Sequence, residues 1–251
     1  MRFTDKVAVI TGAKHGLGLA TARRLAAEGA GVVLADLRDA SDEAALIQGT
    51  ARRAIAVAVD VGDEGQVAEL FAETVTVFGR IDILVNNAAV FIPKPVPLTT
   101  VDDFNGMVNV NLKGAFLCAR EAIPIMKRGG GGVIVNVGSE SSLVGISDGA
   151  VYAATKGAIV QLTKSMAIDH APDGIRVNCV CPGPMATPML TDILTLTPDA
   201  AAAAQAVAAK TLLKRMGAPE EIAAVIAFVA SDEASYMTGA IVAADGGWSV
   251  Q

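Results

Sequence analysis

A tyrosine and a lysine four residues apart form the pattern with the clearest chemical meaning in this sequence. Tyr152 and Lys156 lie in a stretch typical of an α-helix, where this spacing puts both side chains on one face. A phenol has a pKa of about 10, so it acts as a base at neutral pH only beside a cation, which Lys156 supplies. Ser139 lies shortly before them, at the end of a predicted strand, where parallel-sheet proteins place catalytic groups. Each residue alone also fits an ordinary surface or turn position, but together they indicate a catalytic tyrosine.

Three glycines follow the first predicted strand and open a helix. Gly12 permits a tight turn, Gly16 lets the backbone approach a pyrophosphate, and Gly18 allows close packing of the helix. The anion would lie at the helix N-terminus, where N–H groups and the helix dipole attract negative charge. The spacing differs from G-x-G-x-x-G, and glycines this close together also occur in simple turns. The glycines alone are therefore weak support for a dinucleotide site.

An acidic residue at the end of the next predicted strand strengthens that interpretation. Asp36 can accept hydrogen bonds from the adenosine ribose hydroxyls and would repel a 2′-phosphate. The order of strand, loop, helix, strand and acid therefore predicts dinucleotide binding, with NAD favoured over NADP. Lys14, His15 and Arg38 are positive enough nearby to keep NADP as the alternative.

Seven short β-branched runs, alternating with helical spacing, would position these residues. They lack polar alternation, which is typical of strands covered on both faces of a parallel sheet. The runs are 7–11, 32–36, 54–60, 81–86, 133–137, 175–180 and 240–243. The alternation predicts an α/β fold, a doubly wound Rossmann-type sheet of seven parallel strands with helices on both faces.

The organisation predicted from this pattern is a single domain over residues 1–251, because no linker-like stretch divides the chain. Prolines and an alanine-rich helix interrupt the alternation late in the chain. We expect a substrate lid there, over about 188–212, and a plain surface helix is the alternative.

Composition excludes several classes of protein. A net charge of −6 argues against a nucleic-acid-binding face, and no apolar stretch approaches the ~20 residues that span a bilayer. The N-terminal residues show no export signal, so we expect a cytoplasmic protein. Cys118, Cys179 and Cys181 are too few for a disulfide framework, and we expect reduced thiols and no metal site. Cys179 and Cys181 would share one face of a strand.

Further motifs make the whole chain resemble the short-chain dehydrogenase/reductase family. The glycine loop resembles that family's cofactor loop, and Ser139, Tyr152 and Lys156 have its catalytic spacing. Asn86-Asn87-Ala88-Ala89 resembles its Asn-Asn-Ala-Gly motif, with Ala89 where glycine is usual. The remaining matches are Asp60-Val61 at the adenine, Asn111 in the active site, and Pro182-Gly183 with Thr187 beside the nicotinamide.

The resemblance implies an oxidoreductase that transfers a hydride between a nicotinamide cofactor and a secondary alcohol or ketone. Tyr152 would exchange a proton with the substrate oxygen, and Lys156 would lower the pKa of Tyr152 and bind the nicotinamide ribose. Ser139 would hydrogen-bond the substrate oxygen, and Asn111 would hold a water that links Lys156 to solvent. The implied cofactor-binding residues are Gly12, His15, Gly16, Leu17, Gly18, Asp36, Leu37, Asp60, Val61, Asn87, Ala88, Ala89, Tyr152, Lys156, Pro182, Gly183, Met185 and Thr187.

The positions after these motifs outline a mostly apolar pocket, which suits a small, cyclic or largely apolar substrate. The expected substrate-binding residues are Ser139, Ser141, Tyr152, Phe91, Val144 and Met189, with Pro184, Met185 and Leu190 as further apolar walls. Glu140 is a candidate substrate-binding residue, but we expect it to point away from Ser139 and to have a solvated or structural role, because neighbouring side chains alternate along a strand.

The resemblance also implies a homotetramer, formed through the helices near 102–127 and 152–169. These helices carry more apolar positions than one sheet face should cover, namely Ala115, Leu117, Cys118, Ile159, Leu162 and Met166. Two other functions stay open. One is an NADPH-dependent ketoreductase of biosynthesis that acts on an acyl-carrier-protein thioester, and the other is a non-catalytic NAD(H)-sensing protein.

Overall fold

A seven-stranded parallel sheet forms the centre of the protein, in the strand order β3-β2-β1-β4-β5-β6-β7. The computed structural model describes residues 1–50 and 53–250. The strands are β1 (Val7–Thr11), β2 (Gly31–Asp36), β3 (Ala54–Ala58), β4 (Ile83–Asn86), β5 (Gly132–Val137), β6 (Ile175–Pro182) and β7 (Ile241–Ala244). The predicted fold class is confirmed. The expected domain range also includes residues 51, 52 and 251, which lie outside the described part.

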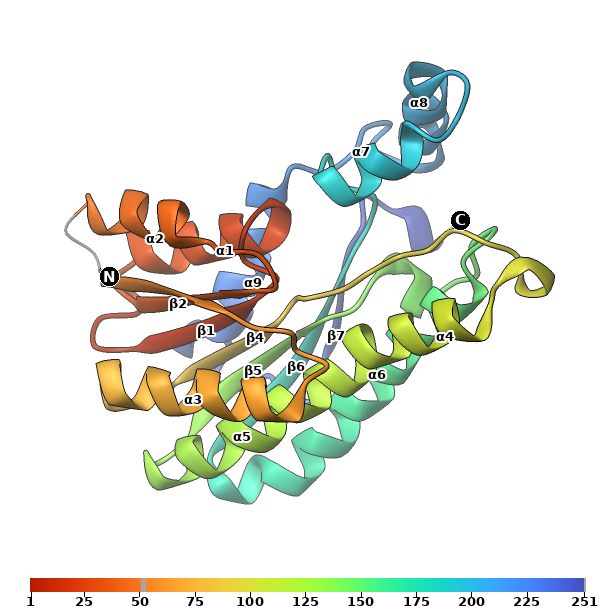
Figure 1. The fold of residues 1–251 in the computed structure, drawn as a ribbon. Coiled ribbons are helices and arrows are strands. Elements are labelled where there is room, and N and C mark those ends of the chain that lie inside the picture. The colour runs from red at the N-terminus through yellow and green to blue at the C-terminus, as the bar shows by residue number, and fades with distance from the viewer. Residues whose placement is uncertain (51–52, 251) are drawn as a thin grey trace.

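Helices cover both faces of this sheet (Figure 1). One face carries α1 (Gly16–Ala27), α2 (Ser41–Gln48) and α9 (Pro219–Ala230). The opposite face carries α3 (Glu64–Phe78), α5 (Gly114–Arg128) and α6 (Ala150–His170), with α4 (Val101–Val108) leading into α5. Two more helices, α7 (Pro188–Leu194) and α8 (Ala200–Lys210), project beyond the end of the sheet (Figure 1).

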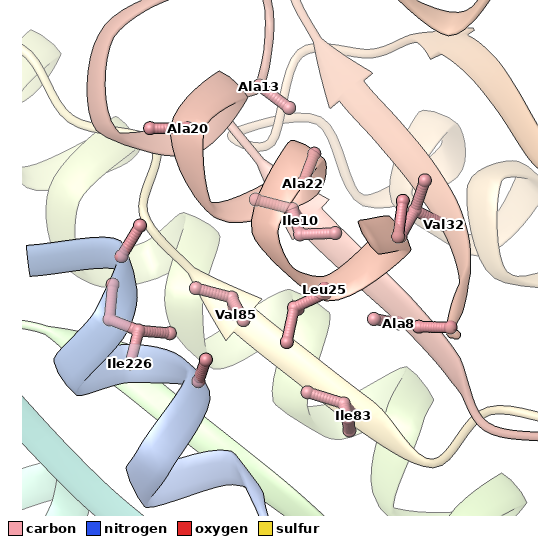
Figure 2. Packing of buried hydrophobic residues seen from close by; sticks show 14 of the residues in the cluster. Ala8, Ile10, Ala13, Ala20, Ala22, Leu25, Val32, Ile83, Val85 and Ile226 are labelled. Atoms are coloured by element: carbon pink, nitrogen blue, oxygen red, sulfur yellow. The ribbon is translucent and has the colours of Figure 1, made fainter. Parts of the chain in front are cut away.

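The core has two layers because alternate residues of each strand point to opposite faces. Ala8 and Ile10 of β1 pack with Leu25 of α1 and Ile226 of α9, as Figure 2 shows. Val9, between them in the sequence, belongs to the cluster under α3, α5 and α6. Every residue of β1 and β2 is buried, which explains why these runs show no polar alternation.

The strand order reverses between β1 and β4, and this is where doubly wound sheets bind ligands at their carboxyl ends. The loops that leave β1, β2, β4, β5 and β6 all open at that edge. The sheet therefore brings together motifs that lie far apart in the sequence.

A π-helical stretch, Asn109–Lys113, connects α4 to α5 and carries Asn111. Its hydrogen bonds run from i to i+5, an arrangement that is rare and is concentrated at functional sites.

The apolar residues expected between subunits are mostly buried within the chain itself. Ala115, Leu117, Cys118, Ile159 and Met166 are all at most 7% exposed, so they form part of the chain's own core. Other large side chains of the same helices are exposed instead, namely Phe104, Phe116 and Ile168. Five of the six apolar residues expected at a subunit interface are therefore core residues of the single chain. The homotetramer itself stays a prediction.

No helix in the described ranges is both long and apolar enough to cross a membrane.

Candidate active site

The loop after β1 is shaped to hold an anion at the start of α1. Gly12 and Gly16 have φ values of +65° and +56°, in the left-handed region that favours glycine. His15 is the N-cap of α1 but its side chain makes no capping bond, and the first turn contains no acidic residue. The N–H groups of that turn are therefore left for a ligand, which fits the pyrophosphate of a dinucleotide.

Two side chains tie this loop to the end of β4. The amide Nδ2 of Asn87 donates to the carbonyl oxygens of Thr11 and Gly12, at 2.9 and 3.0 Å. The hydroxyl Oγ1 of Thr11 accepts from the backbone N–H groups of Asn87 and Ala88, both at 3.0 Å. The side chain of Asn87, expected to bind the cofactor, therefore also holds the loop that would receive it.

Asp36 ends β2 beside this loop, and its carboxylate is anchored by two backbone donors. Oδ2 accepts from the N–H of Lys14 at 2.9 Å, and Oδ1 accepts from the N–H of Arg38 at 3.0 Å. The ammonium of Lys14 forms an ion pair with Glu43 at 2.7 Å, and the guanidinium of Arg38 contacts His15. Both nearby cations thus have partners on the protein.

The remaining cofactor positions lie at the same edge of the sheet. Thr187 lies over the glycine loop, because a Cβ added to Gly16 would meet its side chain at 3.5 Å. Pro182 and Gly183 come at the end of β6. Ala89 has no positive φ, so the alanine that replaces the family's usual glycine fits without backbone strain. Among the other expected contacts, Leu17 lies in the first turn of α1. The rest lie in the loops that follow β2, β3 and β6, namely Leu37, Asp60, Val61 and Met185.

Tyr152 and Lys156 project from the first turns of α6 toward the end of β5. The ammonium Nζ of Lys156 lies 5.8 Å from the centre of the Tyr152 ring and donates to the carbonyl oxygen of Val137 at 2.8 Å. The ring of Phe91, an expected pocket wall, packs on Tyr152 with 4.6 Å between ring centroids. Ser139 lies two residues after the end of β5 and is buried. The structure therefore brings the predicted catalytic residues together.

Burial sets the proton affinities of this group. Desolvation, with a smaller contribution from the charge of Glu140, raises the pKa of Tyr152, while a hydrogen bond with Ser139 lowers it. Desolvation lowers the pKa of Lys156 to about 8, although Cys179, Cys181 and Glu140 act in the opposite direction. The tyrosine is thus a protonated acid at neutral pH in this structure, and lowering of its pKa by Lys156 stays a prediction.

Asn111 connects the loop after β4 to the catalytic helix. Its Oδ1 accepts from the N–H of Val90 at 2.8 Å, and its Nδ2 donates to the Val90 carbonyl at 3.0 Å and to Thr155 Oγ1 at 3.1 Å. Thr155 in turn donates to the carbonyl oxygen of Tyr152. These bonds position the start of α6. The role of Asn111 in holding a water stays a prediction.

Glu140 does not point away from Ser139, contrary to expectation. Strand β5 ends at Val137, and Glu140–Ser142 form a 3₁₀ turn, so strand alternation no longer applies. The hydroxyl of Ser139 donates to Glu140 Oε2 at 2.6 Å. The run Ser-Glu-Ser-Ser after a glycine is typical of a turn, and this signal could have identified Glu140 from the sequence.

The other expected substrate-binding residues differ in exposure. Ser141 is 4% exposed, and its hydroxyl has no hydrogen-bond partner within the described ranges. Val144 is partly buried in the loop before α6. Met189, in α7, is exposed.

The cysteines are free and buried. Cys179 and Cys181 lie on one face of β6 as predicted, with 3.8 Å between their sulfur atoms.

Comparison with known proteins agrees with this arrangement. The family model described as enoyl-(acyl carrier protein) reductase matches residues 12–249. The chain is 43% identical to meso-2,3-butanediol dehydrogenase of Serratia marcescens, over 98% of this chain and 96% of that protein. It is 41% identical to cis-4-hydroxycyclohexanecarboxylate dehydrogenase of Sinomonas cyclohexanicum, over 98% of both chains.

A solved structure is similar over the same extent. The crystal structure of levodione reductase superimposes with a TM-score of 0.96 at 39% identity, covering 99% of each chain. The glycine loop, the Ser-Tyr-Lys group and these relatives all point to the same family. The chain belongs to the short-chain dehydrogenase/reductase family, whose dehydrogenases use a nicotinamide cofactor.

Proposed function

We propose that the protein is an NAD-dependent dehydrogenase that interconverts a small secondary alcohol and its ketone. The observation that carries the proposal is the position of Tyr152, between Lys156 and Ser139 and at the sheet edge that also holds the glycine loop. The named relatives act on a butanediol, on a hydroxylated cyclohexane ring and, in the case of the solved structure, on levodione. A small secondary alcohol or ketone therefore fits both the site and its relatives.

The residues divide the work of such a reaction. When bound, the nicotinamide ring takes up or gives the hydride. Tyr152 gives its proton to the forming alkoxide in reduction and takes it back in oxidation. Lys156 places a positive charge beside the phenol, and Asn111 holds the turn of α6 from which both side chains project. Ser139 stabilises the negative charge that develops on the substrate oxygen.

A panel of secondary alcohols and ketones tests the activity. Purified protein would be assayed with NAD and NADP by the absorbance of the reduced cofactor. Turnover of at least one secondary alcohol supports the proposal. Binding of NADH without turnover of any compound in the panel would instead support the cofactor-sensing alternative.

We expect NAD to be preferred over NADP by at least about tenfold in kcat/KM, or roughly 1.4 kcal/mol. Asp36 would face a 2′-phosphate, and the ammonium of Lys14 is already paired with Glu43. The Asp36→Asn variant should lower the ratio of kcat/KM with NAD to kcat/KM with NADP, because asparagine has the shape of aspartate without the charge that repels a 2′-phosphate. Equal efficiency with both cofactors in the parent enzyme would contradict the assignment. It would favour the biosynthetic NADPH-dependent ketoreductase.

The segment 188–212 is proposed to close over the substrate. Helices α7 and α8 have no buried residue, and they contact each other more than any other element. Such a segment should open easily. We expect its amide hydrogens to exchange rapidly in the free protein and more slowly with NADH and a substrate bound. Equal protection in both conditions would make it a plain surface segment.

We expect a homotetramer in the cytoplasm. Phe104 of α4, Phe116 of α5 and Ile168 of α6 are between 47% and 76% exposed in the single chain, and a subunit interface would cover them. The three free thiols are typical of a reducing compartment. Light scattering at micromolar concentration should give about four times the 25.5 kDa chain mass. A monomer mass would reject this assembly.

A further inference from the structure

The carboxyl group of Glu140 forms part of the active site. The 3₁₀ turn after β5 brings it to Ser139, whose Oγ lies 2.6 Å from Glu140 Oε2. Glu140 is also close enough to Tyr152 and Lys156 for its charge to influence the pKa of both groups. A partly buried carboxyl group thus lies beside the Ser139 hydroxyl that is expected to bind the reacting oxygen.

The hydroxyl of Ser139 cannot serve Glu140 and a substrate at the same time. It has a single proton, which it donates to Glu140, and it accepts from the N–H of Ser141 at 3.2 Å. Stabilising a substrate alkoxide requires that proton to point to the substrate oxygen. In a productive complex, another donor must therefore take the place of Ser139 at Glu140.

Among the residues that the structure describes, Ser139 is the one side chain that hydrogen-bonds Glu140, and the backbone N–H groups of Glu140 and Ser141 also act on its carboxyl group. The ammonium of Lys156 donates to the Val137 carbonyl, and the phenol of Tyr152 is needed at the substrate. Asp245, at the end of β7, is itself acidic and raises the pKa of Glu140 further, after the larger effect of burial. The paired thiols of Cys179 and Cys181 in β6 lie beside Gly138, the residue before Ser139. A hydroxyl of the substrate is therefore the donor that can replace the Ser139 proton without rearranging these side chains.

An alcohol with a single hydroxyl would leave polar groups around Glu140 short of hydrogen-bond partners. Its one oxygen pairs with Tyr152 and Ser139, so Glu140 would lose the Ser139 proton and keep only the backbone N–H groups of its own turn. The buried hydroxyl of Ser141 also lacks a partner within the described ranges. Leaving a buried carboxylate or hydroxyl unpaired is costly, and such sites discriminate strongly against analogues that lack the pairing group.

We propose that Glu140 determines substrate specificity, and that the substrate is a vicinal diol or the corresponding α-hydroxy ketone. The hydroxyl next to the reacting carbon donates to Glu140, which releases the Ser139 proton for the reacting oxygen. In oxidation the reacting hydroxyl would lose its proton to the Tyr152 phenolate, the hydride of the reacting carbon would pass to the bound nicotinamide, and the second hydroxyl would be unchanged. The inference rests on the proposed alcohol dehydrogenase activity and specifies its substrate.

The test compares meso-2,3-butanediol with 2-butanol, which lacks only the second hydroxyl. kcat/KM would be measured for both with NAD in the parent enzyme, Glu140→Leu, Glu140→Gln and Asp245→Asn. The ratio of the two efficiencies within one preparation is insensitive to partial loss of folded enzyme. We expect the parent enzyme to prefer the diol by at least about tenfold.

The variants separate a contact from a general charge effect. Glu140→Leu should reduce the preference to about twofold or less, because the carboxylate acceptor is gone. Glu140→Gln keeps an acceptor oxygen, so part of the preference should remain. In Glu140→Gln, the acid side of the pH–rate profile for alcohol oxidation should move to lower pH, because a neutral amide no longer raises the pKa of Tyr152. Asp245→Asn, the matched control, removes a nearby charge without touching Ser139 and should keep the parent ratio.

An unchanged diol preference in Glu140→Leu would overturn the inference, as would a parent enzyme that oxidises both alcohols equally well. If Glu140→Leu does not fold, Glu140→Gln decides, and an unchanged ratio with an unchanged pH profile rejects the role. A parent enzyme that binds NADH but oxidises neither these alcohols nor any other secondary alcohol would instead reject the proposed function.

Discussion

Replacing Tyr152 with phenylalanine is expected to lower turnover by at least about a hundredfold, the lower end of what general acid–base catalysis contributes. The hydroxyl of Tyr152 is the group placed to exchange a proton with the substrate oxygen. Ser139 cannot substitute for it, because a serine hydroxyl is a far weaker acid than a phenol. The phenylalanine ring would keep the contact with Phe91, so the fold should be unaffected.

The chain provides its own matched control for this change. Tyr236 is fully exposed, and Tyr236→Phe should leave turnover unchanged. NADH binding, followed by fluorescence titration, should be nearly the same in both variants and the parent, because the glycine loop and Asp36 are untouched. Turnover of Tyr152→Phe near the parent rate would remove this residue from the mechanism.

Replacing Gly18 with alanine is expected to weaken NADH binding by at least about tenfold, or roughly 1.4 kcal/mol. A Cβ at this position would overlap the backbone carbonyl oxygen of Gly12 and lie 2.7 Å from Asn87 Nδ2. The first contact is with backbone, so the loop itself must shift. Asn87 holds that loop through the carbonyl oxygens of Thr11 and Gly12, and this support would be disturbed as well.

A second glycine-to-alanine change serves as a control for the general effect of placing alanine in a helix. Gly106 lies inside α4, and an added Cβ there would meet nothing within 4 Å. Gly106→Ala should leave the NADH dissociation constant unchanged and raise stability by about 0.5–1 kcal/mol. Fluorescence titration and thermal melting measure the two quantities. Parent-like NADH affinity in Gly18→Ala would show that the loop adapts to the extra atom.

The sheet and its motifs were predictable because each depends on short-range features of the sequence. A strand buried on both faces appears as an uninterrupted β-branched run, and β1 was predicted to the residue. The order of these runs then fixes which loops meet at the carboxyl edge. Asp36, Ser139 and Lys156 could be placed together for this reason, although they are far apart in the sequence.

The orientation of Glu140 was not predictable from strand periodicity, because that periodicity ends with the last residue of β5. Its side-chain direction depends on a 3₁₀ turn and on the hydroxyl of Ser139. The burial of Leu117 and Met166 within one chain was missed for a similar reason. The sequence shows which residues of a helix are apolar, but it does not show how much of the helix's apolar surface the neighbouring helices cover.

The π-helical stretch Asn109–Lys113 limits how this enzyme can be redesigned for heat resistance. Shortening it by one residue would restore the more common i to i+4 bonding of an α-helix. Each residue turns such a helix by about 100°, so the deletion would rotate Asn111 away from either Val90 or Thr155. A directed-evolution campaign that selects only for melting temperature would favour this one-residue deletion, and the selected variants would lose catalytic activity. One that also selects for turnover should leave the stretch intact and accumulate its changes elsewhere.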